Sequence, residues 1–201
     1  MQPLIVQALT DGSLGKDRLV NAARVQAALQ WFFYVSAIKE ATTCADVAKD
    51  CDSSWAYLSG GSQRGTPSGL AAEINAIAPA TFDRAFDGVL AVRCWRDIDT
   101  ASPAADLELR DRAISQLDVA TLRGVTILVR QRFARLACAT GDHQRAALEA
   151  LQILVPLLDR DLRDRGLSTT ADFLDVEIAK SAADIDVAAV LTALDDAYPC
   201  P

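Results

Sequence analysis

The chain of 201 residues contains a single histidine, His143, and a single methionine, Met1. Imidazole is the usual general base near neutral pH and the commonest transition-metal ligand, so this scarcity argues against a catalytic triad and rules out a site built on two histidines. Haem is not expected, because no histidine or methionine stands at a convincing axial position. The sequence identifies no cofactor.

Only one catalytic pair involving the histidine is conceivable, a dyad of Cys138 and His143 across the turn at Gly141. A nucleophile also needs a pocket and a third group that orients the base, and proximity in sequence supplies neither. The alternative is a solvated histidine in the first turn of a helix. We therefore predict that the protein is not an enzyme.

Long apolar runs and basic stretches are also missing. The longest apolar runs, such as residues 152–158, are far shorter than the roughly 20 residues of a membrane span, so we predict no membrane insertion. The formal net charge is −7 and the isoelectric point is about 4.7. Without a basic stripe that carries aromatic residues, this charge excludes nucleic acid as a partner.

The first residues do not decide whether Met1 is the natural start of the protein. Residues 2–9 lack the basic region of a secretory signal, so Met1 is either the natural start or an addition to a mature chain whose leader was removed.

Five cysteines favour an oxidising compartment, and we predict a periplasmic or secreted protein. Cys44 and Cys51 are close enough in sequence to close a short loop. Cys94 and Cys200 are candidates for a second disulfide that fixes the C-terminus, which leaves Cys138 unpaired. The alternative is five reduced cysteines that pack as small hydrophobic residues.

Helical periodicity dominates the chain and strand patterns are nearly absent, which predicts an all-α bundle of about seven helices within one domain, residues 1–201. A weak recurrence between residues 16–100 and 102–198 suggests two stacked bundles instead. Pro156 is expected to kink the helix that contains it. The clearest predicted helices span residues 16–41, 79–99, 102–138, 170–182 and 185–198, with shorter ones ending at Gly60, beginning at Thr66–Pro67 and following Gly141.

Residues 44–61 contain two cysteines, three aspartates, a tryptophan and a tyrosine, a denser combination of such residues than any other part of the chain. Asp46, Asp50 and Asp52, together with Glu40, form an acidic cluster that suits a hard cation bound through oxygen ligands. A calcium loop that starts at Asp50 fails, because Trp55 occupies the required glycine position. The alternative role for these carboxylates is helix capping and surface solvation.

Arg93 lies on nearly the same predicted helix face as Phe86 and Val89, which points its guanidinium toward the core. An unpaired guanidinium is very costly there, so a carboxylate partner is expected, and the candidates are Asp87, Asp97 and Asp118. Such buried ion pairs either fix the helix register or line a polar pocket for a small anionic ligand.

Three segments resemble one family. Asp52-Ser-Ser-Trp-Ala-Tyr-Leu-Ser-Gly-Gly61, Val155-Pro-Leu-Leu-Asp-Arg-Asp-Leu162 and Tyr198-Pro-Cys200 are similar to segments of low-iron-inducible periplasmic proteins, and the broader pattern resembles imelysin-like helical domains. The Gly-x-His-x-x-Glu motif of the latter is absent, so no metal ligand is transferred. The resemblance implies an exported binding or uptake accessory protein linked to iron assimilation.

We predict a non-enzymatic, exported helical binding protein in which Arg93 and Asp97 support the residues that contact a metal ion or small anionic ligand. The predicted contact residues are Asp50, Asp52, Trp55 and Tyr57. The alternative is a structural module in which the same segment is a disulfide-closed corner, and the helix faces bind a protein partner or a second copy of the chain.

Overall fold

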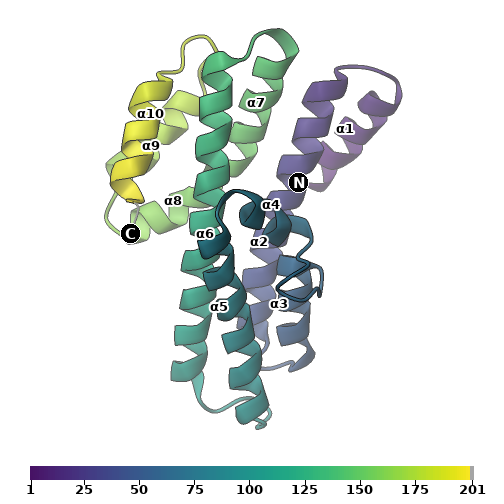
Figure 1. Cartoon of the computed structure of the whole chain (residues 1–201), viewed down its shortest axis with the longest axis vertical. Coiled ribbons are helices and arrows are strands. Elements are labelled where there is room, and N and C mark those ends of the chain that lie inside the picture. The colour runs from purple at the N-terminus through teal and green to yellow at the C-terminus, as the bar shows by residue number, and fades with distance from the viewer. Residues whose placement is uncertain (200–201) are drawn as a thin grey trace. The chain divides into compact units, whose positions relative to one another are not determined.

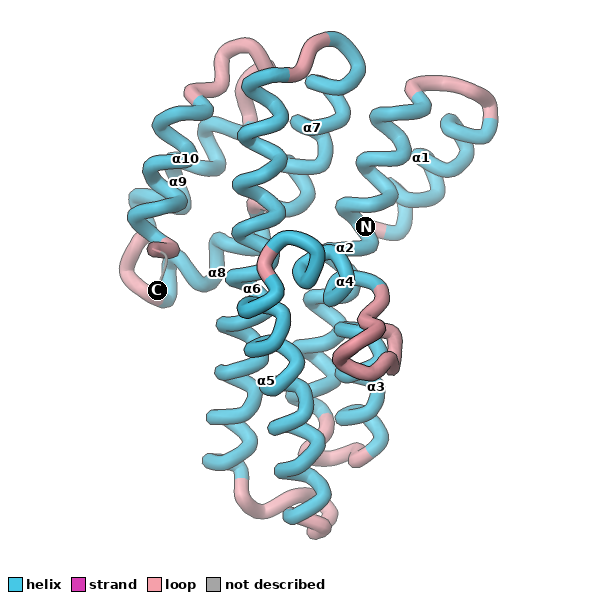
Figure 2. Tube along the Cα trace, viewed as in Figure 1, coloured by secondary structure: helices cyan, strands magenta, loops and turns pink. Residues whose placement is uncertain are grey.

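The structure, a computed structural model, describes residues 1–199, and over this range it contains helices and no strand (Figures 1 and 2). The predicted all-α class is confirmed. The described range holds ten helices where about seven were predicted: α1 (Gln2–Ser13), α2 (Arg18–Thr43), α3 (Lys49–Ser59), α4 (Gly69–Ile77), α5 (Pro79–Ile98), α6 (Leu107–Cys138), α7 (Gly141–Leu154), α8 (Pro156–Asp164), α9 (Ser168–Ile178) and α10 (Val187–Ala197).

The chain divides into two compact units. Unit 1 comprises Met1–Trp31 and Leu128–Pro201, and unit 2 comprises Phe32–Ile127. Both boundaries fall inside long helices, α2 and α6, so each of these helices contributes residues to both units. The units do not coincide with the predicted halves 16–100 and 102–198, and the predicted recurrence between those halves stays a prediction.

Unit 2 is built by packing α3, α4 and α5 with the second part of α2 and the first part of α6. The buried hydroxyl of Ser54 in α3 donates a hydrogen bond of 2.7 Å to the carbonyl of Ala37 in α2. Gly88 brings α5 so close to α6 that an added Cβ would lie 2.6 Å from the Cα atom of Leu117. These close approaches set the spacing of the helices that carry the candidate site.

Unit 1 contains apolar residues at heptad spacing, Leu148, Leu151, Val155, Leu158 and Leu162. Those at 151, 155, 158 and 162 are buried, while Leu148 is half-buried. Pro156 does more than kink the predicted helix: α7 ends at Leu154 and α8 begins at Pro156. A proline has no N–H to donate to the preceding turn, but it is well suited to the first turn of a new helix, so the chain divides there.

Two helices begin later than their Pro residues predict. Ser68 is the N-terminal cap residue of α4, and its hydroxyl donates to the carbonyl of Ser59 at 3.0 Å, which keeps Thr66 and Pro67 in the preceding loop. α6 begins at Leu107 instead of near residue 102. The carboxylate of Asp106 accepts the N–H of Leu109 at 3.0 Å, as an N-cap does. α1 was not predicted.

Replacing Gly88 with alanine tests the contact between α5 and α6. Alanine improves helix propensity by roughly 1 kcal/mol, but the new methyl group meets main-chain atoms that cannot move aside alone. We expect Gly88→Ala to lower the free energy of unfolding by about 2 kcal/mol in urea denaturation. Gly65→Ala is the control, because no atom lies within 4 Å of its added Cβ; equal effects of the two substitutions would contradict the proposed close packing.

Candidate functional site

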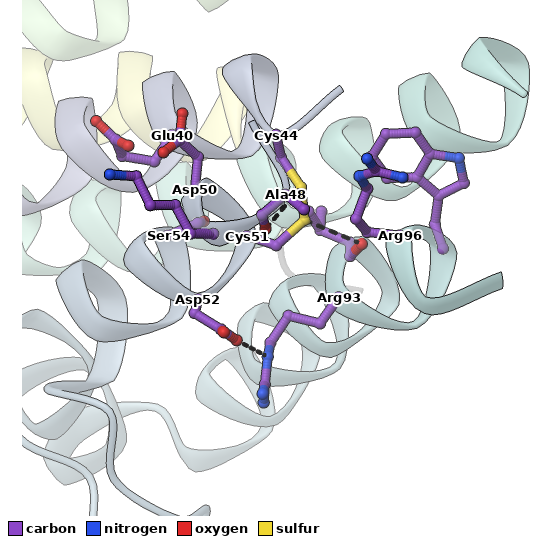
Figure 3. Close-up of a disulfide and its surroundings, with 12 residues drawn as sticks. Glu40, Cys44, Ala48, Asp50, Cys51, Asp52, Ser54, Arg93 and Arg96 are labelled. Atoms are coloured by element: carbon purple, nitrogen blue, oxygen red, sulfur yellow. Dashed lines mark hydrogen bonds and ion pairs between the residues drawn. A yellow bond between two sulfur atoms is a disulfide. The ribbon is translucent and has the colours of Figure 1, made fainter. Parts of the chain in front are cut away.

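Cys44 and Cys51 form a disulfide, as predicted, with their Cα atoms 5.1 Å apart (Figure 3). Cys44 follows the last residue of α2 and Cys51 lies in the first turn of α3. Both residues are buried. The bond therefore fixes the start of α3 to the end of α2.

A cleft of about 330 Å³ lies beside this disulfide, within unit 2. One wall is the first turn of α3 with the residue before it, and the other is the end of α5 with the residues that follow. The lining residues are Ala48, Lys49, Cys51, Asp52, Arg93, Arg96, Asp97 and Thr100. Three of the six predicted ligand-site residues, Asp52, Arg93 and Asp97, are thus brought together.

Arg93 connects the two walls of the cleft. Its Nε donates to Oδ1 of Asp52 at 2.8 Å, and the dashed line in Figure 3 marks this ion pair. The guanidinium carbon also lies 4.3 Å from the ring centroid of Trp55, a cation–π contact. The ring of Trp55 therefore helps to hold the guanidinium of Arg93 in position.

The carboxylate that pairs with Arg93 is none of the three candidates, Asp87, Asp97 and Asp118, so that prediction was wrong. Arg93 pairs with Asp52, whereas Asp118 accepts a hydrogen bond from Tyr34 and Asp87 pairs with Arg64. The guanidinium also does not enter the core, since the Arg93 side chain is 32% exposed. Position 93 lies at the edge of the buried face of α5, where a long side chain can reach the cleft while its alkyl part stays covered.

Arg96 is the most deeply buried cation of the cleft, with only 8% of the residue exposed. One terminal nitrogen donates to the carbonyl oxygen of Asp99. Its buried Nε has no hydrogen-bond partner among the described residues. An unsatisfied donor on a buried guanidinium is costly, and this one belongs to a residue that lines the cleft.

Asp50 and Tyr57 do not line the cleft, although they were predicted to contact the ligand. Asp50 accepts a hydrogen bond of 2.7 Å from Thr43, and Tyr57 makes an edge-to-face contact with Phe32. Both residues belong to α3, where a spacing of seven places them on one face, and Asp52 with Trp55 falls on another. The helical period separates the predicted contact set into two faces.

The predicted acidic cluster is dispersed. Figure 3 shows Asp50 and Glu40 away from the pair of Asp52 and Arg93. Glu40 pairs with Lys39 at 3.1 Å, and Asp46 is exposed. Among residues 1–199, no three acidic, cysteine or histidine side chains come together as a group that could hold a metal ion.

Lys49, Arg96 and Thr100 were not singled out from the sequence. Lys49 precedes Asp52 by three residues on α3, and Arg96 follows Arg93 by three on α5. Residues three apart share a helix face. Extending the predicted site by one turn along each helix would have found both cations.

The segment after α5, which contributes Thr100 to the cleft, is held by hydrogen bonds to the side chain of Asp99. Its carboxylate accepts the backbone N–H groups of Asp106 and Ala105, each at 2.6 Å, and that of Ala101 at 3.3 Å. The hydrogen bond from the Asp106 N–H, with those from Ala105 and Ala101 and the nearby charge of Arg96, lowers the pKa of Asp99 below its ordinary value of 3.8, against a smaller opposing effect of burial.

Asp99→Asn tests this arrangement. Because the folded-state pKa is depressed, the ionised carboxylate stabilises the protein above its unfolded-state pKa, and this contribution is lost as the pH falls through the folded value. We expect the variant to be less stable than the wild type at pH 7, with a difference that begins to shrink below about pH 4. Urea denaturation across this range measures it. A difference that stays constant down to pH 3 would contradict the assignment.

The second predicted disulfide stays a prediction. Cys200 lies outside the described residues, and Cys94 and Cys138 are exposed with free thiols in the structure. Thiol titration of the unfolded, unreduced protein distinguishes the arrangements of its five cysteines. The disulfide between Cys44 and Cys51 alone leaves three thiols, both disulfides leave one, and a count of five would contradict the structure.

Comparisons of the chain with family models, curated proteins and solved structures found no match. No helix between residues 1 and 199 is long and apolar enough to cross a membrane. The resemblance to low-iron-inducible periplasmic proteins stays a prediction.

Proposed function

We propose that this protein is a non-enzymatic, exported helical binding protein that recognises a small anionic ligand in the cleft between α3 and α5. The observation that carries this proposal is the buried guanidinium of Arg96, whose Nε has no partner among the described residues. Burial leaves the charge poorly solvated, so a bound anion gains more from it than from a surface arginine.

The charge balance of the cleft supports an anion. Lys49, Arg93 and Arg96 contribute three positive charges, and Asp52 and Asp97 contribute two negative ones. The pair of Arg93 with Asp52 neutralises one charge of each sign. Carboxylate and phosphate oxygens suit guanidinium donors, because they accept parallel hydrogen bonds. The cleft volume of about 330 Å³ restricts the ligand to a small molecule or ion.

Export is supported by the disulfide between Cys44 and Cys51, because such bonds persist mainly in oxidising compartments. A metal ion has less support, since the described residues offer no cluster of three suitable ligands. The link to iron assimilation stays a prediction from the sequence resemblance. Adding ferrous or ferric iron to the binding experiment tests it directly.

Isothermal titration with inorganic phosphate and with citrate at low ionic strength tests the anion site. We expect Arg96→Gln to weaken binding roughly tenfold or more, since a hydrogen bond to a charged group contributes about 1.5–3 kcal/mol. Lys49→Gln alters an exposed residue and should weaken binding about two- to fivefold without harming the fold.

Arg84→Gln is the matched control, because Arg84 is an exposed arginine on α5 that does not line the cleft. This variant should bind both probes as the wild type does. Equal loss in all three variants would indicate a general charge effect, and absence of binding by the wild type would refute the proposal.

A protein-interaction module is the second candidate, favoured by exposed apolar residues near the start of the chain. Leu9 of α1 is 57% exposed, and with Leu29 of α2 it lines an apolar groove within unit 1. Exposed apolar surface of this kind is typical of sites that bind another protein. Light scattering at several concentrations detects pairing with a second copy, and loss of that pairing in Leu9→Gln would support this role.

A further inference from the structure

Unit 1 contains a larger cavity than the cleft, and none of the functions argued above uses it. The cavity measures about 600 Å³ and lies between α2, the last turns of α6 and the first turns of α7. Much of its wall is made of alanine side chains, one from α2, one after α6 and two from α7. These short side chains leave the space between the helices unfilled and give it apolar walls.

Two side-chain bridges join the helices that line this cavity. Arg24 of α2 makes a bidentate ion pair with Glu149 of α7, with N–O distances of 2.8 and 2.9 Å. Arg132 of α6 donates to the side-chain oxygen of Gln30 of α2 at 2.9 Å. Side-chain bridges therefore link α2 to both of the other helices that line the cavity.

The ionisable groups that line the cavity include no carboxylate. They are Arg132, Arg135, His143 and the thiol of Cys138. Arg135 forms no ion pair with a described residue. Nearby carboxylates are paired elsewhere, since Asp142 binds Arg145 and Glu149 binds Arg24. In a chain of net charge −7, a cavity with this lining is a marked local reversal of charge.

The start of α7 adds to this positive potential. α7 (Gly141–Leu154) begins at the cavity, and its N-cap residue, Thr140, makes no side-chain capping hydrogen bond. The first N–H groups of a helix have no partner within the helix, and they attract negative charge. Together with the two arginines, they give one end of an otherwise apolar cavity the chemistry of an anion site.

We propose that this cavity binds a small organic anion, with its carboxylate or phosphate group near Arg135 and the start of α7 and its apolar body against the alanine walls. The site is separate from the cleft between α3 and α5. A purely inorganic anion would leave the apolar walls uncovered, and a neutral apolar molecule would leave the charge of Arg135 without a counter-ion. An amphipathic anion both covers the apolar walls and supplies a counter-ion.

Cys138 provides a reporter for occupancy, because its exposed thiol lines the cavity, whereas the exposed thiol of Cys94 does not. The probe is 1-naphthoate, and 1-naphthamide is its neutral counterpart. A neutral aromatic disulfide labels the thiols: the Cys138 thiolate attacks one sulfur, a mixed disulfide forms, and the other half leaves as a thiol. Mass spectrometry of the peptides then gives a labelling rate for each cysteine.

A ligand of this size typically binds with a dissociation constant on the order of 1 mM, so we expect 10 mM naphthoate to slow labelling of Cys138 roughly tenfold. Labelling of Cys94 should be unchanged, and the amide should protect Cys138 much less. No protection of Cys138 would overturn the proposal. Equal protection by acid and amide would overturn the assignment of an anion.

Two variants separate charge from volume. Arg135→Gln removes a charge at an exposed position, and Ala146→Leu fills the apolar part of the cavity without altering charge. Both should reduce protection by naphthoate, while Arg84→Gln in unit 2 should leave it unchanged. Protection that survives both cavity variants would place the ligand elsewhere. Phosphate binding that depends on Lys49 is a separate readout, so the two sites succeed or fail independently.

Discussion

The covalent bond between Cys44 and Cys51 is the constraint on which the candidate site depends. α3 begins after Ala48, which has no side chain that can cap the first N–H groups, and no capping hydrogen bond is formed. Such a helix start would fray. The disulfide holds it in place against the end of α2, and with it Lys49 and Asp52, which face Arg93 and Arg96 across the cleft.

Both proposed sites show how an acidic protein can present local positive charge. Its net charge is −7, and several surface arginines are paired with aspartates, as Arg163 is with both Asp159 and Asp172. The electrostatic fields of such paired charges largely cancel, and salt screens what remains beyond a Debye length of about 8 Å at physiological ionic strength. Arg96 in the cleft is buried, so few water molecules screen its charge, and Arg135 at the cavity has no carboxylate partner among the described residues to cancel its charge.

The sequence predicted the fold class, the long helices and the disulfide between Cys44 and Cys51, because each depends on local pattern or short spacing. Asp52, Arg93 and Asp97, which the sequence analysis grouped together, line one cleft, and their role in binding stays a prediction. The prediction that Tyr57 belongs to the same site failed, because residues of α3 were grouped by closeness in sequence and the face of the helix on which each lies was not considered. The predicted partner of Arg93 was wrong because that pairing depends on how α3 packs against α5, which the sequence of neither helix reveals.

The division of the chain has a consequence for how the protein is made. Unit 2 is one continuous stretch, residues 32–127, whereas unit 1 joins the first 31 residues to everything after residue 127. Synthesis proceeds from the N-terminus, and domains generally fold as units as they emerge from the ribosome. All residues of unit 2, including the two cysteines of its disulfide, are therefore synthesised before the last residues of unit 1. Residues 1–31 are thus made before unit 2 but cannot complete unit 1 until the residues after 127 have been made.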